Sequence, residues 1–296
     1  MRMYFAGNCI VDLKRAFLDT NGVKQKQDAE IEETTATYLD KANTETEKSF
    51  LAGDVKGAVL NELSRLNVCS QKGLGEMFDS TIGARTVLMP FGGKYQLTPS
   101  VVMAAKPPVK GRTDTVTVSA YACNPHLMSQ SPFTGAVYSI VTSLSKLVAS
   151  GVRQQTVRLS LQEFFKRLNK DPKRWGQPLS ALLGALYAQL HLGVGAIGGK
   201  DSMSGTFEHI DVPPTLISFA MGISKASKLI SNTVVEDKKA DKIYVISLPR
   251  DEYNMPVFDK VVKLYDVMAD AIEKGLVKSC NVVEEGGTLE KAEDLN

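Results

Sequence analysis

The sequence predicts a mixed α/β protein in which strands and helices alternate along most of the chain. Apolar residues recur at helical spacing in several segments, and shorter β-like runs lie between them, separated by Gly and Pro. At 296 residues the chain has room for about two domains. Its apolar share of 43% and charged share of 23% are those of an ordinary globular protein with a sizeable core.

Charge and cysteine usage exclude several functional classes. A net charge of +2 provides no concentrated basic face for nucleic acid or anionic membranes. The cysteines lie far apart without a C-x-x-C pair, so reduced thiols are expected rather than a zinc site. No stretch approaches the ~20 apolar residues of a membrane span, and the N-terminus meets charged residues too early for a signal peptide. We therefore expect a soluble, cytoplasmic protein.

The first 48 residues are predicted to lie outside the main domain. Residues 9–22 contain a short strand-like run, but no segment in front of it is expected to pair with it. A first residue in mid-element suggests a truncated gene. Residues 24–48 are polar and lack sustained apolar periodicity, so they are predicted to form a connector.

The next segments predict the first half of a complete domain. Helical spacing is found over residues 52–66 and again over 134–150, where Gly151 ends the helix. Strands are expected at residues 86–89, 101–106 and 115–122. In the last of these, one face is predicted to be buried by Val116, Val118 and Ala120.

The second half of that domain contains the segment with most chemical interest. A strand is expected at residues 157–161, and Pro178 is predicted to begin a helix that ends at Gly193. The buried stripe of this helix is predicted to be Leu179, Leu182, Leu183, Leu186 and Leu190. A strand at residues 194–197 then leads into a Gly198-Gly199 bend, and another strand is expected at 215–221.

A new unit is predicted to begin near Lys225. Residues 242–248 (KIYVISL) form a buried-type strand, residues 256–274 a helix, and residues 282–287 a further strand-to-helix turn. So few elements cannot close the core of a sheet domain. We therefore expect a complete domain at residues 49–224 and a truncated one at 225–296.

Two glycine-containing segments are candidate sites. The segment GGKDSMSG (residues 198–205) offers backbone N–H groups, a cation, a carboxylate and hydroxyls, a set suited to phosphate or Mg-nucleotide binding. It lacks Walker A spacing, and a plain turn remains the alternative. The second candidate is residues 85–99, which contain Gly92-Gly93. Its alternative is a hairpin turn with no other role. The histidines are scattered, and Trp175 is expected to anchor its loop.

Taken together, long blocks of the chain resemble the large, single-chain phosphoribosylformylglycinamidine synthases. The resemblance extends from about Gly7 to Gly287 and includes GLGEMFDSTIGARTVLMPFGGKYQLTP (73–99), SPFTGA (131–136), DPKRWGQPLSALLGALYAQLHLGVGAIGGKDSMSGTFE (171–208) and DVPPTLISFAMG (211–222). Residues 1–48 then correspond to the tail of a preceding half and a connector. Residues 49–224 correspond to the N-terminal domain of an aminoimidazole-ribonucleotide-synthetase (PurM-like) unit, whose sheet joins a partner copy in a barrel. Residues 225–296 correspond to the start of its C-terminal α/β domain.

The resemblance also implies an activity. Enzymes of this family use ATP and Mg²⁺ to activate the amide of formylglycinamide ribonucleotide, and ammonia from glutamine then gives the amidine. The implied partners are the other synthetase half and the glutaminase domain, whose catalytic groups are not in this chain. A fragment that contributes part of this ligase site, without turnover of its own, is therefore expected. The alternative is a catalytically degenerate half that scaffolds the synthetase barrel.

Carried over position by position, the resemblance assigns nucleotide and substrate contacts to Gly199, Lys200, Asp201, Ser202 and Ser204. Ser160 and Gln162 match a segment that supplies an ATP-contacting Asp elsewhere, but no carboxylate stands at Leu159 here.

The metal-binding positions of the family depart from its pattern. Where family copies that bind Mg²⁺ carry Asp, Glu and Asn, this sequence reads Ala122, Thr142 and Lys146. Mg²⁺ requires hard anionic oxygens, so no strong metal site is expected in this half, and Lys146 is expected to replace the charge of the metal.

Overall fold

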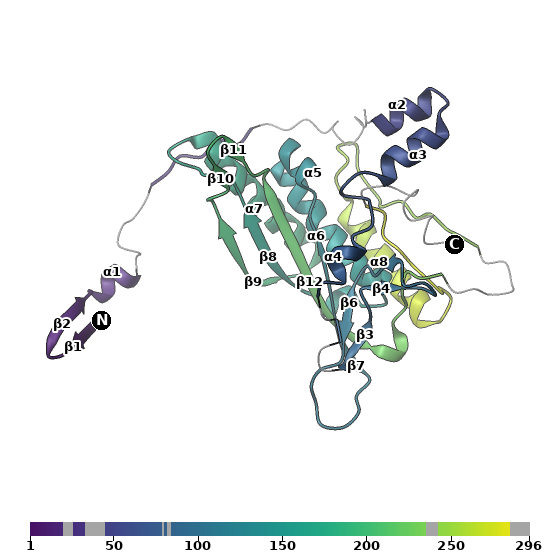
Figure 1. The fold of residues 1–296 in the computed structure, drawn as a ribbon, viewed down its shortest axis with the longest axis horizontal. Helices are drawn as coiled ribbons and strands as arrows, with labels where there is room; N and C mark the ends of the chain where they lie inside the picture. The colour runs from purple at the N-terminus through teal and green to yellow at the C-terminus, as the bar shows by residue number, and fades with distance from the viewer. Residues whose placement is uncertain (20–25, 33–44, 79, 82–83, 235–241, 285–296) are drawn as a thin grey trace.

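A six-stranded mixed sheet lies at the centre of the computed structural model (Figure 1). The structure describes residues 1–19, 26–32, 45–78, 80–81, 84–234 and 242–284. The strand order is β3-β6-β7-β12-β8-β9, and every neighbouring pair is antiparallel except the parallel pair β8–β9. The strands are β3 (Thr86–Leu88), β6 (Met103–Ala105), β7 (Thr115–Ala122), β8 (Arg158–Phe164), β9 (Ala196–Ser202) and β12 (Thr215–Lys225). This confirms the expected class, a mixed sheet with helices.

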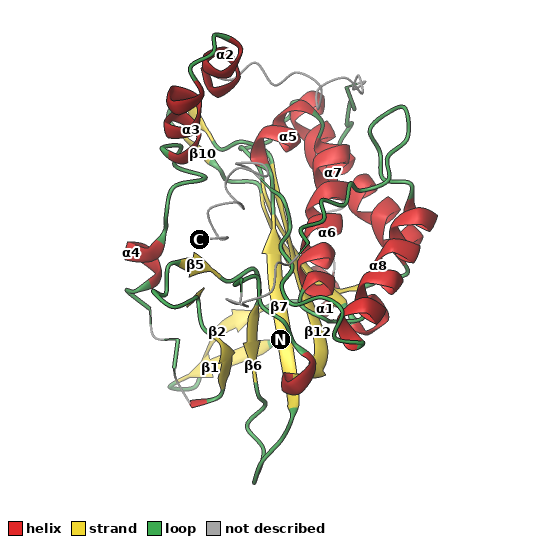
Figure 2. Ribbon diagram, turned by 90° about the vertical axis from the view of Figure 1, so that its right-hand side faces the viewer, coloured by secondary structure: helices red, strands yellow, loops and turns green. Residues whose placement is uncertain are grey.

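One face of the sheet is covered by helices, as Figure 2 shows in side view. The helix α6 (Pro132–Ala149) crosses β7 and β12, and the hydroxyl of Ser131 caps its first turn by accepting from the Thr134 N–H. The apolar residues at helical spacing in α6, namely Val137, Ile140, Leu144, Leu147 and Val148, are buried in one cluster with the alternating apolar residues of β7. Both patterns in the sequence are thus confirmed. Helix α5 (Pro125–Gln130) precedes α6, and α7 (Pro172–Leu192) and α8 (Phe258–Glu273) pack beside it.

Helix α7 differs from its prediction in both its start and its orientation. It begins at Pro172, where Asp171 caps the first turn, so Pro178 lies inside the helix rather than at its start. The predicted leucine stripe is not buried, because its five side chains are 40–72% exposed. The buried face consists instead of small residues, namely Ser180, Ala181, Gly184, Ala185 and Ala188, while Gly176 meets the backbone of Glu30.

Close backbone approach explains this orientation. A Cβ atom at Gly184 would overlap the carbonyl group of Phe133, at the start of α6. Because α6 and α7 lie this close together, only small residues fit between them, and the leucines face outward. Helical periodicity identifies two opposite faces of α7 but does not by itself select the buried one.

In the described residues after Lys225 there is a helix but no strand of the sheet. Helix α8 packs on α6 and α7 through Phe258, Val261 and Tyr265. Residues 242–248 form no strand, and the side chains of 243–246 are 54–75% exposed, so the prediction of a buried strand is wrong. In the described residues no strand pairs with this segment. An apolar run that lacks a neighbouring strand forms no sheet hydrogen bonds, so it does not become a strand. The predicted Gly286-Gly287 turn lies outside the described residues.

The N-terminal residues form a hairpin that stands away from the rest of the chain in Figure 1. Strand β1 (Arg2–Phe5) pairs antiparallel with β2 (Asn8–Asp12), and α1 (Arg15–Asp19) follows. The expectation that nothing precedes residues 9–22 to pair with them is therefore wrong. Ala6 and Gly7 both have positive φ, which permits a two-residue turn between the strands. Of the predicted connector, residues 26–32 contain no helix or strand, and 24–25 and 33–44 lie outside the described residues. Residues 45–48 differ from the prediction, because they form the start of helix α2 (Glu45–Leu51).

The remaining elements are short. The predicted helix at 52–66 is α3 (Val55–Leu63), capped by Asp54, and Gly92 lies in a small hairpin, as its simpler interpretation predicted. No helix within the described ranges is long and apolar enough to cross a membrane. The other elements are α2 (Glu45–Leu51), α4 (Lys72–Gly75), β4 (Phe91–Gly92), β5 (Thr98–Pro99), β10 (Thr206–Phe207), β11 (Ile210–Asp211) and the 3₁₀ turns η3 (Gln154–Thr156) and η4 (Ala226–Lys228).

The close contact between α6 and α7 predicts that a single methyl group added between them lowers stability strongly. Gly184→Ala should lower the free energy of unfolding by about 2–3 kcal/mol, because the added carbon meets backbone that cannot rotate away. Gly195→Ala is the matched control, since a Cβ there meets nothing within 4 Å, and it should change stability by less than about 0.5 kcal/mol. Urea unfolding measures both. Equal effects of the two changes would show that the helices do not pack this closely.

Candidate functional site

The parallel pair β8–β9 brings most of the predicted site residues together. Ser160 is in register with Gly198, Gln162 with Lys200, and Phe164 with Ser202. The two strands are joined through α7, so both end at the same edge of the sheet. The predicted Gly198-Gly199 bend is not present, because β9 runs straight through both glycines to Ser202. The candidate site is therefore an edge strand and its neighbour rather than a loop.

Strand alternation divides these residues between two faces. The register places Ser160, Gln162, Lys200 and Ser202 on the face away from the helices, whereas Gly199 and Asp201 are on the helix side. The residues thus form two small groups rather than one cluster.

Hydrogen bonds within the segment are local. The Lys200 ammonium donates only to the adjacent Asp201 carbonyl oxygen, at 3.3 Å, and is exposed. The Ser202 and Ser204 hydroxyl oxygens lie 3.1 Å apart. An exposed ammonium beside hydroxyl groups suits a phosphate group, but these contacts alone do not form an enclosed site.

Gly199 has a packing role. A Cβ atom at this position would overlap the carbonyl oxygen of Leu161 on β8, so a side chain would push the two strands apart. At Gly198 a Cβ would meet nothing within 4 Å. The glycine at 199 is therefore accounted for by strand packing, without a ligand.

Glu163 is a candidate residue that the sequence analysis missed. It is only 4% exposed, and neither of its carboxylate oxygens has a hydrogen-bond partner in the part of the chain that the structure describes. Burial, together with the charge of Asp201 in register on β9, raises the pKa of Glu163 to about 7. The signal was present in the sequence: Leu159, Leu161 and Phe165 alternate on the buried face, and Glu163 occupies a position in the same series.

Lys146 lies where the resemblance placed a metal in other family copies. Its ammonium donates to the Tyr121 carbonyl at 2.9 Å, lies 2.8 Å from the Glu284 carboxylate, and is 5.2 Å from the centre of the Tyr121 ring. Tyr121 precedes Ala122, and Thr142 is one turn before Lys146 on α6. A buried ammonium at this place does not fit a Mg²⁺ ion, because the two cations would repel each other. Within the described ranges, no three His, Cys, Asp or Glu residues are grouped as metal ligands.

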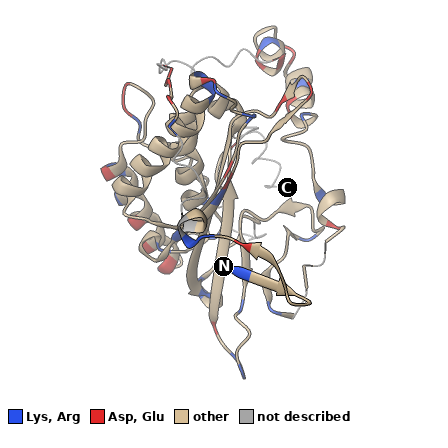
Figure 3. Cartoon of the chain, turned by 90° about the vertical axis from the view of Figure 1, so that its left-hand side faces the viewer, with Lys and Arg blue, Asp and Glu red and all other residues tan. Residues whose placement is uncertain are grey.

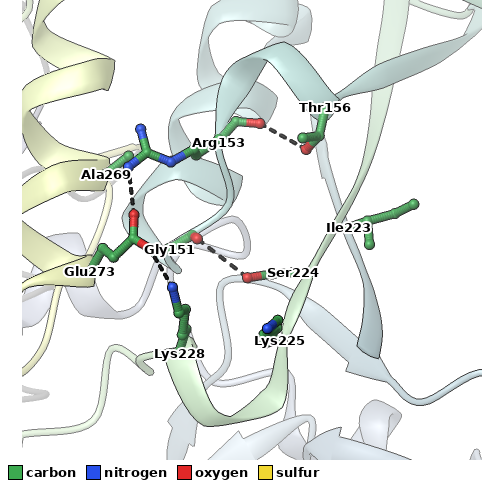
Figure 4. Close-up of a pocket in the computed structure, with 9 residues that line it drawn as sticks. All are labelled: Gly151, Arg153, Thr156, Ile223, Ser224, Lys225, Lys228, Ala269 and Glu273. Carbon is green, nitrogen blue, oxygen red and sulfur yellow. Dashed lines mark hydrogen bonds and ion pairs between the residues drawn. The ribbon is translucent and has the colours of Figure 1, made fainter. Parts of the chain in front are cut away.

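A pocket of about 200 Å³ lies at the other end of the sheet, near the last residues of β12 (Figure 4). Arg153 pairs there with Asp270 at 2.7 Å and with Glu273, and Lys228 also pairs with Glu273. Lys228 and Arg153 lower the pKa of Glu273 to about 2. None of the predicted site residues lines this pocket. Its ion pairs instead connect α8 to Arg153, just before the 3₁₀ turn η3, and to Lys228 in η4, the turn that follows β12.

The scattered residues have structural roles. His191 stacks on Phe258 and meets Tyr187 edge-on, with ring centres 5.0 Å and 4.3 Å apart, so it is a packing histidine. The Trp175 indole donates to the Asn169 carbonyl and anchors its loop as expected. Figure 3 shows Lys and Arg distributed over many elements together with Asp and Glu.

Comparisons with known proteins were made for the sequence and for the fold. No family model matches the chain. It is similar to the phosphoribosylformylglycinamidine synthase subunit PurL of Thermoplasma acidophilum, with 21% identity over 100% of this chain and 39% of that protein. The PurL subunit of Pyrobaculum aerophilum is 25% identical over 67% of this chain and 26% of its own length. The chain therefore spans about two fifths or less of the length of these relatives.

Solved PurL structures share the fold. Thermotoga maritima PurL complexed with ATP aligns with a TM-score of 0.61 over 93% of this chain and 38% of that one, at 14% identity. The same protein complexed with FGAR gives a TM-score of 0.56 over 93% of this chain and 37% of that one, also at 14% identity. The expected resemblance to this synthase and the PurM-like fold class are thus confirmed.

The Glu163 carboxyl predicts how stability depends on pH. The pKa of Glu163 is about 7 in the folded chain, against an ordinary glutamate value of 4.5, so the folded state holds more protons than the unfolded state between these values. Stability from this group is therefore present at low pH and lost as pH rises through the window. In the wild type, titration of Glu163 should lower the free energy of unfolding by about 2–3 kcal/mol between pH 4.5 and pH 8, and Glu163→Gln should remove this decline.

Urea unfolding at several pH values measures this slope. Glu252→Gln, at an exposed loop position, is the matched control and should retain the wild-type pH dependence. An unchanged slope in Glu163→Gln would show that Glu163 is not the titrating group.

Proposed function

We propose that this chain is part of the synthetase region of an ATP-dependent ligase that converts formylglycinamide ribonucleotide, glutamine and ATP to formylglycinamidine ribonucleotide. The observation that carries the proposal is similarity to PurL along the whole chain, together with the fold shared with Thermotoga maritima PurL. The relatives in complex with ATP and with FGAR support a nucleotide and an amide ribonucleotide as ligands. Residues 49–224 would form one domain, and 225–296 the start of the next.

In this proposal, β8 and β9 contribute one wall of the nucleotide and substrate site. Lys200 would supply a positive charge to phosphate oxygens, and the hydroxyl groups of Ser202 and Ser204 would orient them. Ser160 and Gln162 lie on the same face as Lys200 and would contact the remaining part of the ligand. When bound, ATP supplies the phosphoryl group. The other walls of the site would come from the partner half.

Exposed apolar residues on the open face of the sheet, the face away from the helices, favour the presence of a second synthetase half. Side chains on this face include Tyr121, Phe164, Met221 and Ile223, all of them exposed. A sheet face with such residues normally packs against another layer. We propose that the other synthetase half covers this face, with the glutaminase domain supplying ammonia from glutamine.

Magnesium would be held by the other half. At the position of Lys146 an ammonium, neutralised by Glu284, stands where a cation would bind. The proposal that this half has no strong metal site of its own rests on this ion pair and on the departures at Ala122 and Thr142.

A scaffold role is the second candidate, and specific observations favour it. Gly199 is explained by packing against Leu161, and Lys146 occupies the metal position. The described pocket lies at the opposite end of the sheet from Ser202. In this alternative the half supports the barrel without contacting ligands.

Kinetics of the complete synthase distinguish the two roles. Lys200→Ala should lower kcat/KM for ATP about tenfold, because an exposed charged contact to phosphate contributes about 1.4 kcal/mol. The melting temperature should stay unchanged. Lys110→Ala, another exposed lysine, is the matched control and should behave as wild type.

The scaffold role makes the opposite prediction. Replacing both Asp201 and Ser202 by Ala would then lower the melting temperature and leave the kinetics normal. That result, together with normal kinetics in Lys200→Ala, would remove the ligand-binding role from β9.

A further inference from the structure

Helix α7 carries an apolar surface that no described segment fully covers. We call it the leucine face, and it consists of Leu179, Leu182, Leu183, Leu186 and Leu190. These side chains are 40–72% exposed although helices α6 and α8 both pack on α7. An exposed apolar face of this kind marks an interaction site.

The composition of α7 supports this interpretation. From Trp175 to Leu192 the helix contains no Asp, Glu, Lys or Arg. A helix whose outer face meets water normally carries charged residues there. On α7 the small-residue face and the leucine face are both uncharged. The leucine face therefore has the composition of a second buried face.

The leucine face also continues an interface that is present. Phe258 of α8 contacts Tyr187 and His191 of α7, with ring centres 5.5 Å and 5.0 Å apart. Tyr187 is one helical turn from Leu183, so α8 covers one flank of the leucine face and leaves the rest open.

We propose that the leucine face is the contact between two copies of this chain, in which α7 packs antiparallel against α7 of the second copy about a twofold axis. The leucines are spaced three and four residues apart, so the same face on two antiparallel helices can interdigitate about the twofold axis. The face extends over 12 residues, or roughly 16 Å from Leu179 to Leu190, and Leu183 and Leu186 flank its midpoint. Antiparallel pairing also opposes the two helix dipoles favourably.

The area sets the strength of this contact. Five half-exposed leucines and Tyr187 from each copy would bury on the order of 1,000 Å² in total, at the low end for a specific interface. The dimer is therefore weak and depends on concentration. No like charges meet across the contact, because this stretch of α7 has none.

The proposed contact is separate from the open sheet face. The leucine face lies in the helical layer, whereas Met221 and Ile223 are on the other side of the sheet. Since the open face is proposed to meet the other synthetase half, self-association through either face must be distinguished by the experiment.

Sedimentation equilibrium of this chain, from ~1 to ~200 µM, tests the proposal. The wild type should shift from monomer to dimer across this range. Leu183→Asp with Leu186→Asp should weaken dimerisation at least about a hundredfold, because four carboxylates would face each other near the axis. Met221→Asp with Ile223→Asp, on the open face, is the matched control and should dimerise as wild type.

Thermal melting confirms that each variant is folded, and Leu186→Ser alone provides a milder change if the double variant is not. That single change should weaken the dimer about tenfold. The proposal is overturned if the chain stays monomeric at every concentration. It is also overturned if dimerisation survives the α7 changes and is lost with those on the open face.

Discussion

The close approach of α6 and α7 is the constraint on which much of this structure depends. Where Gly184 meets the backbone of Phe133, there is no room for a Cβ atom, and the helices are joined through small residues. This contact fixes the rotation of α7 about its axis and turns the leucines outward. Because α7 connects β8 to β9, it also belongs to the crossover that holds these two strands parallel at the edge of the sheet. The candidate site and the leucine face are thus placed by the same helix.

Local patterns predicted the sheet domain well where one face alone is buried. The alternation in β7 identifies its buried side directly, because the residues between the apolar ones are mostly polar. In α6 the apolar residues at helical spacing are buried as expected, although the helix is enclosed on most sides and buries Ser139 and Ser143 as well. The pattern fails on α7, where small residues and leucines occupy opposite faces and both are uncharged. It fails again at residues 242–248, because a strand needs a pairing edge that the described chain does not provide. Gly198 and Gly199 were predicted to bend the chain, yet Gly199 serves close strand packing instead.

The assignment of ligand contacts to Lys200, Asp201 and Ser202 stays a prediction. The structure places these residues on β9, and the strand register brings Ser160 and Gln162 of β8 beside them. The sequence could not show that alternation separates Lys200 from Asp201, since this requires the extent of β9. Glu163 was missed because the predicted strand ended at residue 161, although the apolar alternation around Glu163 is present in the sequence. The two buried ionisable groups are stabilised in different ways. Lys146 is neutralised by Glu284, whereas Glu163 has no hydrogen-bond partner among the described residues and its pKa rises.

Strand β9 has one further consequence as the last strand of the sheet. Within the described residues, one side of its backbone is not paired in the sheet, and such an edge can recruit foreign strands and start aggregation. The sequence of β9 opposes this, because two adjacent glycines weaken any added pairing and Lys200 and Asp201 place opposite charges on its two faces. The four residues 198–201, which resemble a ligand-binding motif, therefore also disfavour the pairing of a further strand.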